Sequence, residues 1–155
     1  MLRLHATCVA LDGLAVLLQG PSGAGKSDLA LRLIDRGAVL VADDQVLVRN
    51  EGGRLIASAP ATIAGRIEVR GLGILRLPAL AGAPVCALFE LATGPVERLP
   101  VRRLRNLEGV DIPWIALNPF ECSAGAKVRL AVRAFASDIN ACPDPASSSA
   151  GFVFP

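Results

Sequence analysis

A glycine-rich segment of eight residues offers the clearest chemistry in this sequence of 155 residues. It reads Gly20-Pro21-Ser22-Gly23-Ala24-Gly25-Lys26-Ser27 and fits the phosphate-binding pattern G-x-x-x-x-G-K-[ST]. Glycines let the backbone N–H groups point at phosphate oxygens, and a following helix adds its positive N-terminal end. Lys26 would reach the β- and γ-phosphates, and the Ser27 hydroxyl is a ligand for Mg²⁺. The segment predicts a nucleotide or phosphate site, and the alternative is a tight glycine turn with a solvated lysine.

An acidic pair, Asp43-Asp44, is the second candidate for chemistry. It follows a short apolar stretch that reads as a buried strand, and such strands end at the edge of a parallel sheet where ligands bind. One of the two carboxylates would then face the phosphates as a Mg²⁺ ligand or a general base. The alternative is a solvated Asp-Asp turn.

The elements that must position these groups follow from the hydrophobic pattern. Residues 14–18 form a continuous apolar run, residues 27–36 have a helical period, and residues 38–42 form a second apolar run. Gly37 stands where the helix should stop. This order of strand, loop, helix and strand predicts a βαβ unit with parallel strands.

The rest of the chain indicates more strands and one further helix. We expect a hairpin from residues 46–49 and 54–57, strands over 67–69 and 85–91, and a helix over 123–139. Residues 1–139 are predicted to form one domain, and residues 140–155 a flexible tail. The final helix has a basic side with Lys127, Arg129 and Arg133, which is either a docking face for a protein partner or an ordinary solvated face.

Composition and charge exclude several classes of protein. The 16 Lys and Arg residues against 14 Asp and Glu give a net charge of +2, too small for a nucleic-acid binder. The longest uncharged apolar stretch, residues 77–89, is too short for a membrane-spanning helix of about 20 residues. Four scattered cysteines and a single histidine favour buried thiols over disulfides or a zinc site. We therefore expect a cytoplasmic protein without a nucleic-acid or membrane partner.

Four segments in order resemble the catalytic domain of HPr kinase/phosphorylase. They are His5, the phosphate loop at 20–27, LVADD at 40–44 and IEVRGLGI at 67–74. The resemblance covers about residues 4–135. It implies a mixed α/β sheet with a phosphate loop and flanking helices, as in the HPr kinase and phosphoenolpyruvate carboxykinase-like fold. It also implies a bacterial enzyme that phosphorylates a serine of HPr, the phosphocarrier protein of the phosphotransferase system, and removes that phosphate by phosphorolysis.

The resemblance also assigns roles to residues that their chemistry alone does not distinguish. It implies ATP bound by residues 20–27, Mg²⁺ held by Ser27 and Glu68, and Asp44 as proton acceptor in phosphorylation and proton donor in phosphorolysis. Asp43 would support Asp44 or the metal, and the resemblance adds Lys26, His5 and Arg98 to the catalytic residues. It implies a homo-oligomer, a hexamer in the family.

Some of the family's features are missing from this sequence. We expect a short form that lacks the family's usual N-terminal domain. The family's P-G-R-N element is not present, and residues 111–119 occupy the region of that element. Two other functions stay open: a small-molecule phosphotransferase or carboxykinase-like enzyme, and a regulatory module that binds ATP without catalysis.

Overall fold

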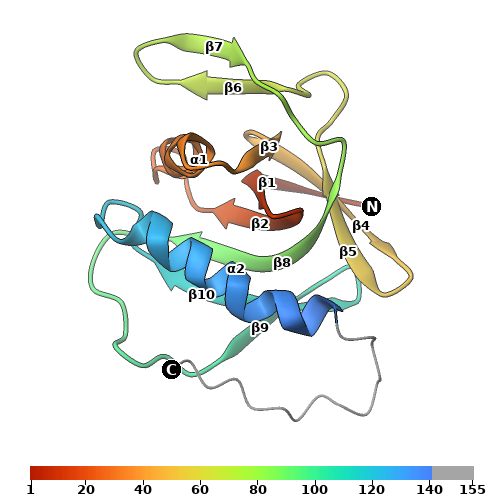
Figure 1. Cartoon of the computed structure of the whole chain (residues 1–155), viewed down its shortest axis with the longest axis vertical. Helices are drawn as coiled ribbons and strands as arrows, with labels where there is room; N and C mark the ends of the chain where they lie inside the picture. The colour runs from red at the N-terminus through yellow and green to blue at the C-terminus, as the bar shows by residue number, and fades with distance from the viewer. Residues whose placement is uncertain (141–155) are drawn as a thin grey trace.

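The computed structural model describes residues 1–140, which form one mixed α/β fold of ten strands and two helices (Figure 1). The strands are β1 Leu2–Leu11, β2 Leu14–Gln19, β3 Val39–Ala42, β4 Gln45–Glu51, β5 Arg54–Ser58, β6 Arg66–Val69, β7 Gly73–Arg76, β8 Ala83–Leu91, β9 Arg103–Leu107 and β10 Val110–Leu117. The helices are α1 Lys26–Asp35 and α2 Ala124–Asn140. The predicted mixed sheet with flanking helices is confirmed.

Two long strands, β1 and β8, each take part in two sheets. The first half of β1 pairs with β4 and its second half with β2 and β3. Likewise, β8 pairs with β5 near its start and with β2 and β10 further along. The larger sheet therefore has the order β3-β1-β2-β8-β10-β9, and β4 and β5 complete a smaller sheet that packs against it.

The two sheets and the helices enclose two apolar cores. One lies between the larger sheet and helices α1 and α2, and includes Leu18, Leu29, Phe89 and Phe135. The other lies between the two sheets and includes Leu17 and Leu88. Neighbouring residues of β2 and β8 thus face opposite cores, which explains why these strands read as continuous apolar runs.

Four strands of the larger sheet run in one direction. Strands β2, β8 and β10 are parallel neighbours, and β3 has the same direction because β2 and β3 are both antiparallel to β1. The carboxyl ends of all four strands consequently lie at one edge of the sheet. The phosphate loop follows β2 at this edge, and the acidic pair follows β3.

The predicted βαβ unit is confirmed in the direction of its strands, with one addition. Strand β1, which the sequence reading did not identify, lies between β2 and β3 and pairs with both. The predicted hairpin, the strand at 67–69, the strand at 85–91 and the final helix are all present. Strands β7, β9 and β10 were also missed. Asn140, expected to begin the tail, is the last residue of α2, and the rest of the expected tail, residues 141–155, lies outside the described residues.

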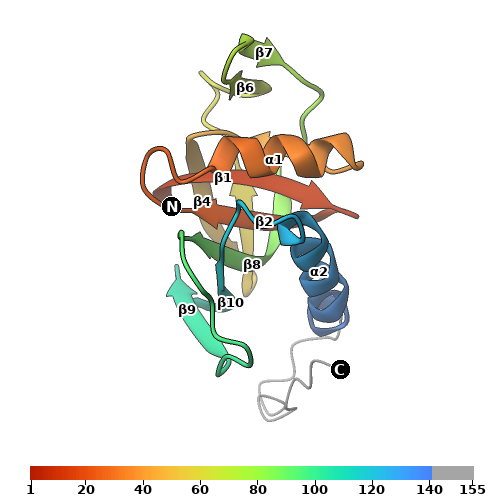
Figure 2. The ribbon, with the colours of Figure 1, turned by 90° about the vertical axis from the view of Figure 1, so that its left-hand side faces the viewer.

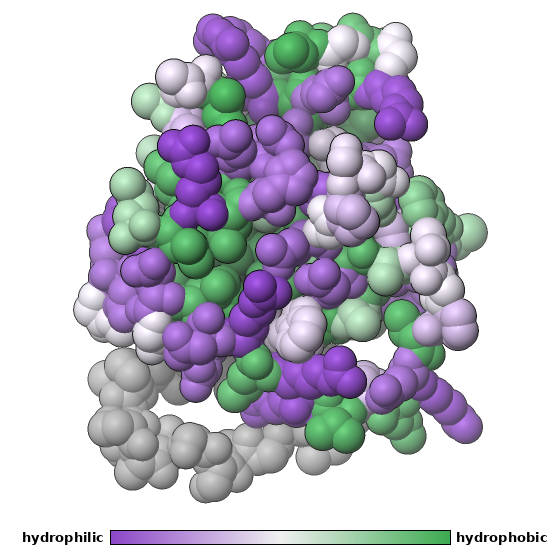
Figure 3. Space-filling view, turned by 180° about the vertical axis from the view of Figure 1, so that it is seen from behind, coloured by the Kyte–Doolittle hydropathy of each residue, from purple (hydrophilic) through white to green (hydrophobic). Residues whose placement is uncertain are grey.

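The β6–β7 hairpin stands apart from the sheets, above α1 in Figures 1 and 2. Ile67 and Val69 of β6 join the core under α1, whereas Leu72 and Ile74 are each 71% exposed. In the space-filling view from behind, hydrophobic and hydrophilic residues are mixed at this upper end of the molecule (Figure 3). Within residues 1–140, no helix combines the length and the apolar character needed to cross a bilayer.

Candidate active site

The phosphate loop joins β2 to α1, and two of its glycines fix its conformation, one by close packing and the other by a left-handed backbone. A Cβ at Gly20 would lie 3.0 Å from both the Leu91 carbonyl oxygen and the Ala24 Cβ, so a larger residue would require β8 or the loop to shift by a few tenths of an ångström. Gly25 caps the N-terminus of α1 with a φ of 93°, a left-handed conformation that favours glycine. The Leu29 N–H bonds the Gly25 carbonyl at 2.9 Å and begins the helix. The N-terminal end of α1 therefore opens onto the loop, as phosphate binding requires.

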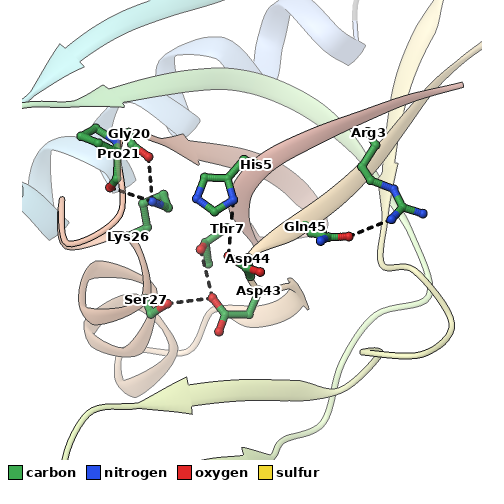
Figure 4. A network of polar contacts seen from close by, with 10 residues as sticks. All are labelled: Arg3, His5, Thr7, Gly20, Pro21, Lys26, Ser27, Asp43, Asp44 and Gln45. Atoms are coloured by element: carbon green, nitrogen blue, oxygen red, sulfur yellow. Dashed lines mark hydrogen bonds and ion pairs between the residues drawn. The ribbon is translucent and has the colours of Figure 1, made fainter.

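Lys26 is buried at the centre of the loop. Its Nζ donates hydrogen bonds to the carbonyl oxygens of Gly20, at 2.7 Å, and Pro21, at 2.9 Å (Figure 4). The ammonium group thus lies inside the concave side of the loop instead of extending into solvent. This position contradicts the alternative of a solvated lysine on a simple glycine turn.

Asp43 is buried and accepts three hydrogen bonds. Its Oδ1 accepts from Ser27 Oγ at 2.8 Å and from Thr7 Oγ1 at 3.0 Å, and its Oδ2 accepts from the Glu68 N–H at 3.0 Å. These donors come from α1, β1 and β6, so the carboxylate connects three elements and holds the Ser27 hydroxyl in place. Figure 4 shows the contacts with Ser27 and Thr7. Asp43 is therefore not part of a solvated turn.

Asp44 differs from its neighbour in both exposure and backbone. Its side chain is 66% exposed and its φ is 68°, a conformation that aspartate and asparagine adopt more readily than most residues. The His5 Nδ1 lies 3.4 Å from Asp44 Oδ1, and His5 is itself 56% exposed. The left-handed residue turns the chain so that one carboxylate enters the protein and the next faces solvent.

Strand β1 supplies the polar groups that line this acidic pair. Every second residue from Arg3 to Thr7 points to the same face of the strand. Arg3 contacts Gln45, His5 contacts Asp44 and Thr7 contacts Asp43. The Ala6 N–H also bonds the Asp44 carbonyl at 3.1 Å. Thr7 was missed by the sequence reading, although its spacing of two from His5 could have placed it on the same strand face.

The structure brings the backbone of Glu68 to the acidic pair. Its N–H donates to Asp43, while its side chain is exposed. Within residues 1–140 no group of three or more His, Cys, Asp or Glu side chains could hold a metal ion. A nucleotide-bound Mg²⁺ needs fewer protein ligands, because phosphate oxygens and water complete its shell. The hydroxyl of Ser27 and the carboxylate of Asp43 are hard oxygen ligands that fit this requirement.

The remaining predicted residues lie on other segments of the chain. Arg98 is exposed on the segment between β8 and β9, and no hydrogen bond or ion pair of its side chain is found in the described part of the chain. Arg129 and Arg133 of α2 line a pocket with Asp12 and Arg36. Because Arg36 follows the C-terminal end of α1, this pocket lies at the edge of the sheet opposite the phosphate loop.

The fold and the site together define a mixed α/β protein with a glycine-rich loop between β2 and α1 and an acidic pair beside that loop. The family model for the HPr serine kinase C-terminal domain matches residues 1–88, which is more than half of the chain. The chain therefore belongs to the family of HPr serine kinase C-terminal domains, and the resemblance seen in its sequence is confirmed.

Curated relatives and a solved structure agree with this assignment. HPr kinase/phosphorylase of Clostridium tetani is 50% identical over 80 residues, which cover 52% of this chain and 26% of that protein. The enzyme of the same name from Listeria monocytogenes is 48% identical over 84 residues, covering 54% and 27%. The chain thus spans about a quarter of the length of these relatives. The Hpr(Ser) kinase/phosphatase structure from Coxiella burnetii matches 90% of this chain and 99% of that chain, with a TM-score of 0.78 and 27% identity.

Proposed function

We propose that this chain is a kinase core that transfers the γ-phosphoryl group of ATP to a serine of an HPr-type phosphocarrier protein. The observation that carries the proposal is the placement of the acidic pair. Asp43 is hydrogen-bonded to Ser27 of the phosphate loop, and Asp44 faces solvent one residue further on. Phosphoryl transfer to a hydroxyl needs a carboxylate near the phosphates that an incoming serine can reach.

The roles of the loop residues follow from their contacts. Backbone N–H groups at the start of α1 bind the phosphates, and Lys26 exchanges the Gly20 and Pro21 carbonyl oxygens for phosphate oxygens. Mg²⁺, when bound with ATP, neutralises charge on the β- and γ-phosphates. Ser27 and Asp43 would hold it, with the carboxylate of Glu68 as a further ligand. Asp43 orients the Ser27 hydroxyl for this purpose.

The proton of the acceptor serine goes to Asp44. As the serine oxygen forms its bond to the γ-phosphorus, the bond from that phosphorus to the bridging oxygen breaks, and ADP leaves. The serine hydroxyl is a weak nucleophile, so a general base that accepts its proton accelerates the step. His5, 3.4 Å from Asp44, holds the carboxylate in position. Arg98 would contact the phosphoryl group or the partner from the segment after β8.

The same residues support removal of the phosphoryl group by phosphorolysis. Inorganic phosphate attacks the phosphorus of phosphoserine, pyrophosphate forms, and a protonated Asp44 returns the proton to the serine oxygen. An exposed carboxylate suits both reactions because a serine or a phosphoserine of a protein partner can reach it from solvent. The homo-oligomer that the family resemblance implies also remains a prediction, which light scattering on the purified protein tests.

Mass detection of phosphoserine tests the proposed function. The purified protein is incubated with HPr, ATP and Mg²⁺, and in a second reaction phosphorylated HPr is incubated with inorganic phosphate. We expect a gain of one phosphoryl group on a serine in the first reaction and pyrophosphate in the second. ATP binding without phosphoserine would favour a regulatory module, and transfer of label to metabolites alone would favour a small-molecule phosphotransferase.

A further inference from the structure

The turn that follows β10 places an aromatic ring against the phosphate loop. A Cβ at Gly25 would lie 3.4 Å from both Cε1 and Cζ of Phe120, and 3.3 Å from Cγ of Pro119. The ring therefore touches the loop at the residue that begins α1. In Figure 2 the segment between β10 and α2 rises toward α1, in agreement with this contact.

This ring is exposed although other phenylalanines of the protein are buried. Phe120 is 60% exposed, whereas Phe89 and Phe135 are 1% and 4% exposed. Its edge rests on the loop, and much of the ring remains accessible. Because the ring lies against residue 25 of the phosphate loop and is 60% exposed, a group bound at the loop can reach it.

The turn that carries Phe120 is fixed by polar contacts on both sides. The Phe120 N–H donates to Asn118 Oδ1 at 3.0 Å, and Arg32 of α1 donates to the Pro119 carbonyl oxygen. Lys127 of α2 also pairs with Glu121 at 2.6 Å. These contacts fix the backbone that carries the ring before any ligand binds. A group that stacks on the ring therefore loses little binding free energy in ordering the site.

The position of the ring relative to the loop indicates which part of a ligand it meets. Strand β10 is parallel to its neighbour β8, and β8 is parallel to its neighbour β2. The turn after β10, which carries Phe120, therefore lies at the same edge of the sheet as the phosphate loop, on the β8 side of β2. The acidic pair follows β3, on the other side of β2 and beyond β1. Transfer of the terminal phosphoryl group takes place toward the acidic pair, so the opposite end of a bound nucleotide points toward Phe120.

We propose that the Phe120 ring forms one wall of the site for the nucleotide's base, and that adenine stacks on it. This inference rests on the proposed function, because it assumes that residues 20–27 bind the phosphates of ATP. A ring recognises the flat face of a base, which every base possesses. The ring therefore distinguishes ATP from a bare polyphosphate, and it accepts GTP as well as ATP.

Binding of ATP and of inorganic tripolyphosphate to the same variants tests this inference. Both ligands fill the phosphate loop, and only ATP carries a base. We expect Phe120→Ala to raise the Kd for ATP about ten-fold, the effect of losing one base–aromatic stack, and to leave the Kd for tripolyphosphate unchanged. Phe120→Tyr keeps the ring and should keep the affinity for ATP. Leu130→Ala removes a side chain of equal exposure, 60%, from α2 and is the matched control.

Two outcomes overturn the inference while leaving the proposed function intact. Unchanged ATP binding in Phe120→Ala would show that the base lies elsewhere. An equal loss for ATP and tripolyphosphate would show that the ring only supports the loop. By contrast, a wild-type protein that binds tripolyphosphate but not ATP would contradict the proposed function itself. Thermal unfolding of each variant verifies that the fold is retained.

Discussion

The hydroxyl of Ser27 donates a 2.8 Å hydrogen bond to the buried carboxylate of Asp43, which joins the phosphate loop to the end of β3. The same carboxylate accepts from Thr7 and from the backbone of Glu68, so four separate segments of the chain meet at one side chain. The fold thereby fixes the orientation of Ser27 before any nucleotide binds. This arrangement leaves the neighbouring Asp44 free to act on the acceptor.

Asp43→Asn is expected to weaken both the fold and the response to Mg²⁺. An amide offers one oxygen, so its NH₂ group must face at least one of the three donors that now point at Asp43. A buried donor left without an acceptor costs about 1–3 kcal/mol of unfolding free energy. Urea unfolding measures that loss, and ATP titrations with and without Mg²⁺ should show a smaller gain from Mg²⁺ than in the wild type. An unaltered gain would contradict the role given to Asp43.

Thr7 and Asp43 are expected to be energetically coupled. Thr7→Val keeps the shape of the side chain but removes the donor to a charged group, a bond worth about 1.5–3 kcal/mol. In the double variant with Asp43→Asn the two losses should not add, because both remove the same contact. Urea unfolding of the four proteins gives the coupling energy. A coupling energy near zero would mean that the Thr7 hydroxyl does not stabilise Asp43.

The buried thiols are expected to make the protein less stable at high pH. Burial raises the pKa of Cys86 to about 12 and raises that of Cys8 as well, from an ordinary value of 9.0. Above pH 9 the thiols of the unfolded chain ionise while the folded thiols stay protonated, so unfolding becomes more favourable. Between pH 8 and pH 10 each such thiol lowers the unfolding free energy by about 1 kcal/mol.

Urea unfolding at the two pH values tests this expectation against a Cys86→Ala variant. The variant should lose less unfolding free energy between pH 8 and pH 10 than the wild type. An equal loss in both proteins would show that Cys86 does not contribute. In thiol labelling at pH 8, Cys122 should react in the folded protein, whereas Cys8 and Cys86 should react only after unfolding.

The sequence predicted those strands and helices whose hydrophobic pattern matches the way they are buried in the fold. Strand β2, the phosphate loop, α1 and β3 follow one another without interruption, and each has its own signature. Strand β1 was missed because its first half has one polar face and its second half is buried on both faces, so no single period describes it. Strand β10 was missed because it contains Pro113, and proline is uncommon inside a sheet. Pro113 pairs with β9 alone, since the pairing of β10 with β8 begins one residue later, at Trp114.

The site was predictable to the same extent. The loop and the acidic pair came from contiguous motifs, whereas the opposite burial of Asp43 and Asp44 depends on a left-handed backbone that no motif reveals. The spacing of two from His5 places Thr7 on the same strand face, but its contact with Asp43 depends on the pairing of β1 with β3. Phe120 meets Gly25 across 95 positions of the chain, and no local pattern connects the two.

Asp44→Asn gives the most direct test of the central claim, which is that Asp44 takes the proton of the acceptor serine while other residues bind ATP. Asparagine tolerates the positive φ at this position, so the backbone should be retained. Asp12→Asn is the matched control, because Asp12 is also exposed, has a φ of 51° and lies at the opposite edge of the sheet. The measurement is the rate of phosphoserine formation on HPr, with the Kd for ATP determined alongside.

We predict that Asp44→Asn lowers the rate about 10²- to 10⁴-fold, the usual contribution of a general base, with an unchanged Kd for ATP. Asp12→Asn should match the wild type in both. A rate for Asp44→Asn within a few-fold of the wild type would contradict the account, because the proton would then leave by another route.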